Sequence, residues 1–132
     1  MMCIKYSDSF EYTFTKDTAD TYYSPWFDIS WANEIYAFKE ITFGVTRTGN
    51  ETEALTVVKN TPHGETMVLT FTPRTATHAG EEKYGREMYD HDTPGSENKL
   101  GMRVRFKLVL GGTSWTGSRE YTVICNMYAK RN

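Results

Sequence analysis

The sequence predicts an all-β protein, an antiparallel two-sheet β-sandwich of about seven to nine strands. Three observations support this fold class. Apolar and polar residues alternate along several stretches, Thr and aromatic residues are frequent (7 Phe, 9 Tyr and 3 Trp), and Gly- or Pro-containing turns recur at short spacing. A jelly roll is one form of this sandwich, and a closed barrel is the second choice.

The 132 residues predict a single domain over 1–132, large enough to bury roughly two-thirds of its unfolded surface. Residues 1–15 are expected to supply an arm or the first strand. Within them, residues 9–15 place Phe10, Tyr12 and Phe14 on one face of a strand.

The next segments follow in order. Residues 16–24 are polar and predict a connection, and residues 24–30 predict a short strand that Pro25 opens at an edge or entry point. After a brief turn, residues 35–46 predict a strand that is apolar on both faces near its start, and therefore central in a sheet.

Two further strands are predicted on either side of a turn at 60–65, where proline and glycine favour a reversal. They span residues 54–59 and 66–72, and Pro73 ends the second because it has no backbone donor.

Residues 74–98 lose the apolar pattern and predict one long polar insertion. A connection of this length without regular structure is unusual in a compact domain, so it is expected to be functional or mobile. Its aromatic residues suggest that it docks on the domain or on a partner. A short strand over 84–89 is the alternative.

The clearest pattern lies between Leu100 and Met127. Residues 102–110 alternate between apolar and mostly cationic side chains, a Gly-rich run follows at 111–118, and residues 121–127 alternate again. The pattern predicts two strands joined as a β-hairpin with one buried face. The outward cations of the first strand are assigned to a solvated face, with a phosphate-binding track as the alternative.

The net charge of −2 and the pI near 5.9 predict no general attraction to nucleic acid or to anionic membrane. No apolar run reaches the length of a membrane span, and no apolar signal segment opens the sequence, so folding in a cytoplasm is expected. Cys3 and Cys125 lie far apart, and a buried reduced thiol is expected at Cys125.

The sequence predicts no catalytic residue, no metal site and no cofactor. The three histidines lack the spacing of a ligand pair, and no G-x-S-x-G elbow is present. The EF-hand pattern fails at its fifth and twelfth positions, which leaves an irregular calcium site at Asp90, Asp92 and Glu97 as the alternative to a solvated acidic loop.

Aromatic and cationic residues are the candidates for contacts with other molecules, because Trp, Tyr and Arg are enriched in protein interfaces. The interface candidates are Trp115, Tyr84, Tyr89, Trp26, Trp31, Arg103 and Arg105. Trp26, Trp31 and Trp115 are also the candidates for an alternative site, an aromatic platform on which sugar rings stack. Core or core-edge positions are the simpler interpretation of Trp26 and Trp31.

Three segments carry a family resemblance: Ser-Pro-Trp-Phe-Asp-Ile-Ser at 24–30, Ala-Leu-Thr-Val-Val-Lys at 54–59, and Arg-Val-Arg-Phe-Lys-Leu-Val-Leu-Gly-Gly-Thr-Ser-Trp-Thr at 103–116. Together they resemble the strands of small virion proteins of tailed bacteriophages, over residues 24–128. The resemblance implies a non-enzymatic capsid decoration protein, assembled in the host cytoplasm, on the outer surface of the head shell.

Such a protein would contact the major capsid protein and its own copies, often as trimers. Residues 1–15 and 74–98 are candidates for these contacts. The alternative from another class is a carbohydrate-binding or receptor-binding module of the kind found in tail fibres.

Overall fold

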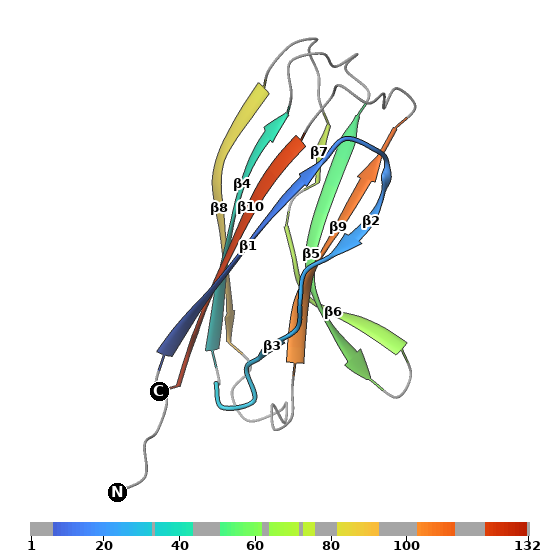
Figure 1. Ribbon diagram of the computed structural model, residues 1–132. Coiled ribbons are helices and arrows are strands. Elements are labelled where there is room, and N and C mark those ends of the chain that lie inside the picture. The colour runs from blue at the N-terminus through green and yellow to red at the C-terminus, as the bar shows by residue number, and fades with distance from the viewer. Residues whose placement is uncertain are drawn as a thin grey trace, which may run out of the picture.

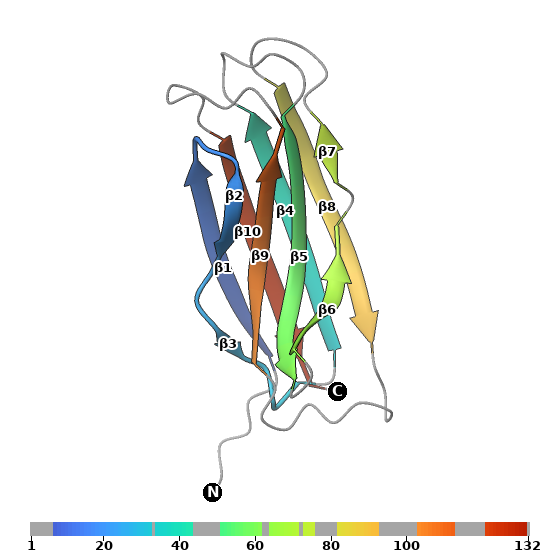
Figure 2. The same cartoon turned by 90° about the vertical axis from the view of Figure 1, so that its right-hand side faces the viewer.

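The computed structural model describes residues 7–32, 34–43, 51–61, 64–71, 73–75, 82–92, 103–112 and 121–131, with the backbone alone for Glu34, Phe43, Thr61 and 82–92. Within this part of the chain, ten β-strands form two antiparallel sheets that lie face to face, and no helix is present (Figures 1 and 2). The predicted all-β two-sheet fold is confirmed.

Sheet A has the strand order β1-β10-β4-β8. Its strands are β1 (Ser7–Lys16), β4 (Glu34–Phe43), β8 (Glu82–Asp92) and β10 (Tyr121–Lys130). Sheet B has the order β2-β9-β5-β6, with β3 also paired to β9 and β7 also paired to β5. Its strands are β2 (Asp20–Tyr23), β3 (Phe27–Asp28), β5 (Thr52–Thr61), β6 (Gly64–Thr70), β7 (Arg74–Thr75) and β9 (Arg103–Gly111).

The order of the strands is that of a jelly roll. The short strands β2 and β3 form one interrupted edge of sheet B, and β6 and β7 form the other. If each edge is counted as one strand, the described chain has eight, and the sheets read 1-8-3-6 and 2-7-4-5. This double Greek key is the jelly-roll arrangement, and two separate sheets replace the closed barrel of the second choice.

The core lies between the sheets and follows the predicted alternation. Val104, Phe106, Leu108 and Leu110 of β9 are buried, as are Tyr121, Val123, Cys125, Met127 and Ala129 of β10. Each large apolar side chain buried in this way contributes roughly 1.5–3 kcal/mol. Alternate positions on the same strands remain on the outer faces of the sandwich.

The predicted hairpin between β9 and β10 is wrong. The strands exist, but β9 pairs with β2, β3 and β5, whereas β10 pairs with β1 and β4 in the other sheet. Their buried faces oppose each other across the core and do not lie side by side. Alternation identifies the apolar side of a strand, but it does not identify the strand's hydrogen-bonded neighbour.

The polar insertion at 74–98 is also corrected, because it contains β7 and the eleven-residue strand β8. The alternative of a strand over 84–89 is confirmed, and that strand is longer than expected. Since β8 is the edge strand next to β4, its backbone pairing completes sheet A even though its sequence has no apolar alternation. Residues 93–98 lie outside the described residues.

Two early segments differ from expectation. The polar connection at 16–24 contains β2, and the strand predicted over 24–30 is reduced to β3. The first strand and the central position of the strand that begins near Ile35 are confirmed by β1 and β4. Residues 1–6, the first part of the possible arm, lie outside the described residues.

Candidate interaction site

The outer face of sheet B carries an arginine that is stacked between two aromatic rings. The guanidinium carbon of Arg105 lies 3.8 Å from the centroid of the Tyr23 ring and 4.3 Å from that of the Trp26 ring. Such a contact contributes roughly 0.5–1 kcal/mol at an exposed site. Arg105 Nε is buried without a hydrogen-bond partner among the described residues, so the two rings are the main described contacts of this guanidinium.

Local backbone irregularity explains how Trp26 reaches Arg105. Tyr23 of β2 pairs with Lys107, and Phe27 of β3 pairs with Val104, so three edge residues lie opposite two residues of β9. The extra residue is a β-bulge, a feature that changes the direction of a side chain at a sheet edge. It places Trp26 over β9 on the outer face.

Ser24 fixes this bulge to β9. Its Oγ accepts a hydrogen bond of 2.8 Å from the Phe106 backbone N–H, and its own N–H donates to the Phe106 carbonyl at 3.0 Å. Pro25, which follows, has no N–H to donate to a ladder. A buried serine and a proline therefore position the aromatic residue that follows them.

Two more cations lie on the same strand. Lys107 Nζ is 2.6 Å from Glu65 Oε1, and this hydrogen bond raises the pKa of Lys107 against the opposing effect of burial. Arg103 is exposed and lies opposite Asp28 in the register. Arg103, Arg105 and Lys107 occupy successive outward positions, about 6.6 Å apart along β9. We call Tyr23, Trp26, Arg103, Arg105 and Lys107 the arginine cluster.

The structure brings three of the seven interface candidates together: Trp26, Arg103 and Arg105. Trp31 instead packs against the core, and its Nε1 donates to the Asp28 carbonyl at 3.2 Å. Tyr23 was not among the interface candidates predicted from the sequence, although its place next to Ser24-Pro25-Trp26 is a signal that the sequence contains.

The remaining candidates lie elsewhere. Tyr84 and Tyr89 belong to β8, where they are paired with Ile41 and Ala37 of β4. Trp115 lies outside the described residues. The three tryptophans are therefore not seen as one sugar platform, and contact of any candidate with a partner stays a prediction.

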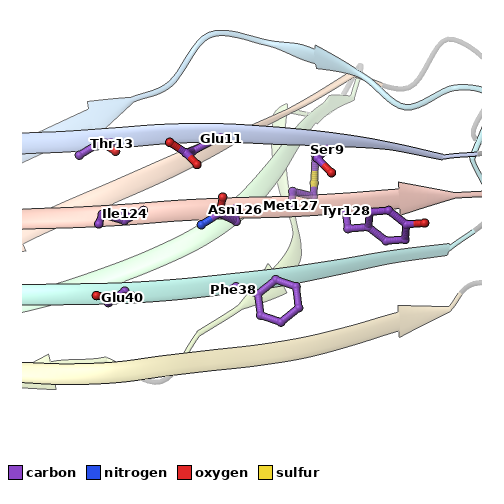
Figure 3. A pocket seen from close by; sticks show the side chains of 9 residues that line it. All are labelled: Ser9, Glu11, Thr13, Phe38, Glu40, Ile124, Asn126, Met127 and Tyr128. Atoms are coloured by element: carbon purple, nitrogen blue, oxygen red, sulfur yellow. The ribbon is translucent and has the colours of Figure 1, made fainter.

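The outer face of sheet A has a different character. A shallow groove of about 570 Å³ crosses β1, β10 and β4 (Figure 3). The residues that give it its chemistry are Glu11, Phe38, Glu40, Ile124, Asn126 and Tyr128, and we call this surface the acidic groove.

The acidic groove combines carboxylates with aromatic rings. Glu11, Asn126 and Phe38 form one row across the sheet, and Ile124 and Glu40 belong to the next. None of the described residues forms an ion pair or hydrogen bond with Glu11 or Glu40, and both are exposed.

Aromatic rings lie beside these carboxylates. Tyr128 is 38% exposed, and its ring centroid lies 6.4 Å from that of Tyr36. An exposed apolar surface with a polar rim is typical of an interaction site.

Charged groups are also found inside the core, where they are enclosed. Lys39 of β4 forms an ion pair with Glu53 of β5, and Lys39 is paired in register with Cys125 of β10. Burial, and after it the charge of Glu53, raises the pKa of the Cys125 thiol. The thiol is therefore neutral and shielded, which is the opposite of a reactive cysteine, and the predicted buried reduced Cys125 is confirmed.

The described residues contain no group of three or more His, Cys, Asp and Glu side chains placed to hold a metal ion. They also contain no helix with the length and apolarity needed to cross a membrane.

The fold is similar to part of a viral protein. A chain in the structure of the Gx strain of infectious bursal disease virus matches with a TM-score of 0.50 and 13% identity, over 96% of this chain and 32% of that chain. A chain of the VP2 subviral particle of the same virus matches with a TM-score of 0.42 and 10% identity, over 96% and 33% of the two chains. The present chain thus spans about a third of the length of these chains. At 13% identity, the likeness to the Gx-strain chain shows the fold alone. No protein-family model and no curated protein sequence matches the chain.

Proposed function

We propose that this protein is a non-enzymatic structural component of a virus particle, located at the surface of the shell as a decoration protein. One observation carries the proposal: the described chain is a jelly roll, and 96% of the chain aligns with a chain in the structure of infectious bursal disease virus at a TM-score of 0.50. Jelly rolls form the shells of many viruses, although lectin domains and cupins share the architecture. At 13% identity, the match supports the fold but does not indicate the kind of virus, so a tailed-phage source stays a prediction.

The partners proposed are the major capsid protein and further copies of the chain, with a trimer favoured. Sheet A supports the proposal because its two edges are formed by the long strands β1 and β8, which offer backbone donors and acceptors to a neighbouring subunit. The arginine cluster supports it as well, since Arg105 lies against the Tyr23 and Trp26 rings, and Arg, Tyr and Trp are enriched among the residues that anchor protein interfaces.

The experiment is co-expression of the chain with the major capsid protein from the same genome. Particles are separated on a density gradient, and the chain in the particle fraction is quantified. The proposal expects a fixed number of copies per shell, visible as density on the outer surface by electron cryomicroscopy. Particles that assemble without any of the chain, while the folded chain remains in the soluble fraction, would overturn it.

A matched pair of variants examines the arginine cluster in the same assay. Arg105→Glu is expected to reduce the copies per particle, because it replaces a stacked cation with an anion. Arg131→Glu makes the same change of charge at an exposed position outside the cluster and is expected to leave the copy number unchanged. Circular dichroism of each soluble variant checks that both are folded.

A further inference from the structure

We infer that the acidic groove of one copy binds the arginine cluster of a second copy of this chain. The inference rests on the complementarity of two surfaces of one molecule, which lie on the outer faces of opposite sheets. It adds the acidic groove as the partner surface of the arginine cluster in a contact between copies, and this contact can be examined without any shell.

The charges of the two surfaces are complementary. The groove carries Glu11 and Glu40, both without a partner among the described residues, and no described Lys or Arg side chain lines it. The cluster carries Arg103, which is exposed, and Arg105, which is half-buried against the rings of Tyr23 and Trp26. An Arg–carboxylate contact satisfies both sides through charge-assisted hydrogen bonds.

The remaining side chains of the two surfaces also match. The groove presents the half-buried Phe38 and Ile124 beside Tyr128, and the cluster presents Tyr23, which is 40% exposed, beside Trp26. Aromatic and aliphatic groups surrounded by charged groups are the composition of a specific interface, in which the apolar centre is desolvated and the rim is polar. A sugar fits the rings of the groove equally well, but it does not account for the two carboxylates without a described partner, which a surface rich in arginine complements.

The size of the surfaces sets the expected strength. The outer face of a sheet of four strands, spaced about 4.8 Å apart and about ten residues long, measures roughly 19 Å by 33 Å, so the contact covers at most about 600 Å² per partner. Specific interfaces bury about 800 Å² per partner, so this contact is expected to be weak and to become stable when many copies are held together.

The symmetry of the contact follows from its position. Because different surfaces meet, the contact is heterologous, and repetition gives either a closed ring or an open row of copies. An isologous contact of two grooves is opposed by repulsion, since it would bring the carboxylates of Glu11 and Glu40 from both copies together.

The test is sedimentation velocity of the purified full chain at increasing concentration and at low salt, with two double variants. One variant is Arg103→Glu/Arg105→Glu and the other is Glu11→Lys/Glu40→Lys. Wild-type protein is expected to associate as concentration rises. Each double variant alone is expected to weaken association at least about tenfold. An equimolar mixture of the two is expected to associate again, because each altered surface then meets one of opposite charge.

Controls and outcomes keep the inference distinct from the proposed function. Asp17→Lys and Arg131→Glu lie outside both surfaces and are expected to associate like the wild type. Three results would each overturn the inference. The wild-type protein could stay monomeric at about 100 µM, or the double variants could still associate. The third is that the two double variants are folded but do not associate when they are mixed. A monomeric chain that still decorates particles would overturn only this inference, whereas copies that associate but never enter particles would overturn only the proposed function.

Discussion

Lys39 and Glu53 form an ion pair that joins the two sheets through the core. Lys39 Nζ lies 2.9 Å from Glu53 Oε1 and 3.2 Å from Oε2, and the two side chains are 1% and 0% exposed. Lys39 belongs to β4 of sheet A, and Glu53 to β5 of sheet B. A buried charge is tolerated when it is paired and hydrogen-bonded, so this pair constrains how the two sheets face each other.

Removing one member of this ion pair is expected to lower the free energy of unfolding more than removing both members. Lys39→Met removes the Lys39 ammonium from the buried Glu53 carboxylate, and a loss of about 3–5 kcal/mol in the free energy of unfolding is expected. The double variant Lys39→Met/Glu53→Met removes both charges and is expected to recover most of that loss. Urea denaturation measures all three proteins, and a single variant that costs less than about 1 kcal/mol would contradict this account of the core.

Ser24→Ala is expected to destabilise the protein by about 1–3 kcal/mol, because the buried Phe106 N–H loses the acceptor that Ser24 Oγ provides. Ser9→Ala, an exposed change on β1, is the matched control and is expected to stay within about 0.5 kcal/mol of wild type. Equal effects of the two substitutions in chemical denaturation would show that the bulge does not depend on Ser24.

Stacking of Arg105 on Trp26 is expected to appear as an energetic coupling. In a double-mutant cycle of Arg105→Ala and Trp26→Ala, the interaction free energy is expected to be about 0.5–1 kcal/mol. The same cycle with Trp31→Ala serves as the comparison, since Trp31 packs against the core, and its coupling with Arg105 is expected to be near zero. Absence of coupling between Arg105 and Trp26 would remove the physical basis of the arginine cluster.

Cys125 is expected to make stability fall at alkaline pH. Burial raises the pKa of its thiol in the folded protein, whereas the unfolded thiol has the ordinary value of 9.0. Above pH 9 the unfolded chain releases this proton, whereas the folded chain keeps it. The contribution of Cys125 to the free energy of unfolding is therefore complete below pH 9 and declines as the pH rises, by up to about 1.4 kcal/mol per pH unit. Cys125→Ala should therefore show a flatter decline between pH 9 and pH 10.5 in urea denaturation, and identical slopes would disprove the assignment.

The faces of the strands could be predicted from the sequence, but their neighbours could not. Alternation placed Phe14, Val104 and Val123 in the core because the pleat turns every second side chain to the same side. Pairing depends on how the chain crosses between sheets, and the Gly-rich run after β9 is equally compatible with a hairpin and with a crossing. The strand β8 was missed in full length because an edge strand can be held by backbone hydrogen bonds alone.

The arginine cluster also depends on strand pairing that the sequence does not reveal. Arg103 and Arg105 were visible as outward cations, but the contact of Arg105 with Trp26 depends on a one-residue bulge that no periodicity reveals. The core ion pair did leave a signal in the sequence. Lys39 stands among the inward-facing apolar residues Ile35, Ala37 and Ile41 of β4. Glu53 likewise precedes the inward-facing apolar residues Leu55 and Val57 of β5. Two opposite charges on two apolar faces are evidence that the faces meet.

The place of β10 between β1 and β4 has a consequence for synthesis. A chain emerging from the ribosome carries the two flanking strands of sheet A early, yet the strand that bonds to both is the last of the described strands to be translated. Pairing over such a separation is slow, and until it occurs the edge of β1 that β10 covers in the native sheet is also open to other chains. The complete native sheet A therefore forms only after translation of β10, and we expect nascent copies crowded on one messenger to be most prone to aggregation just before that strand leaves the exit tunnel.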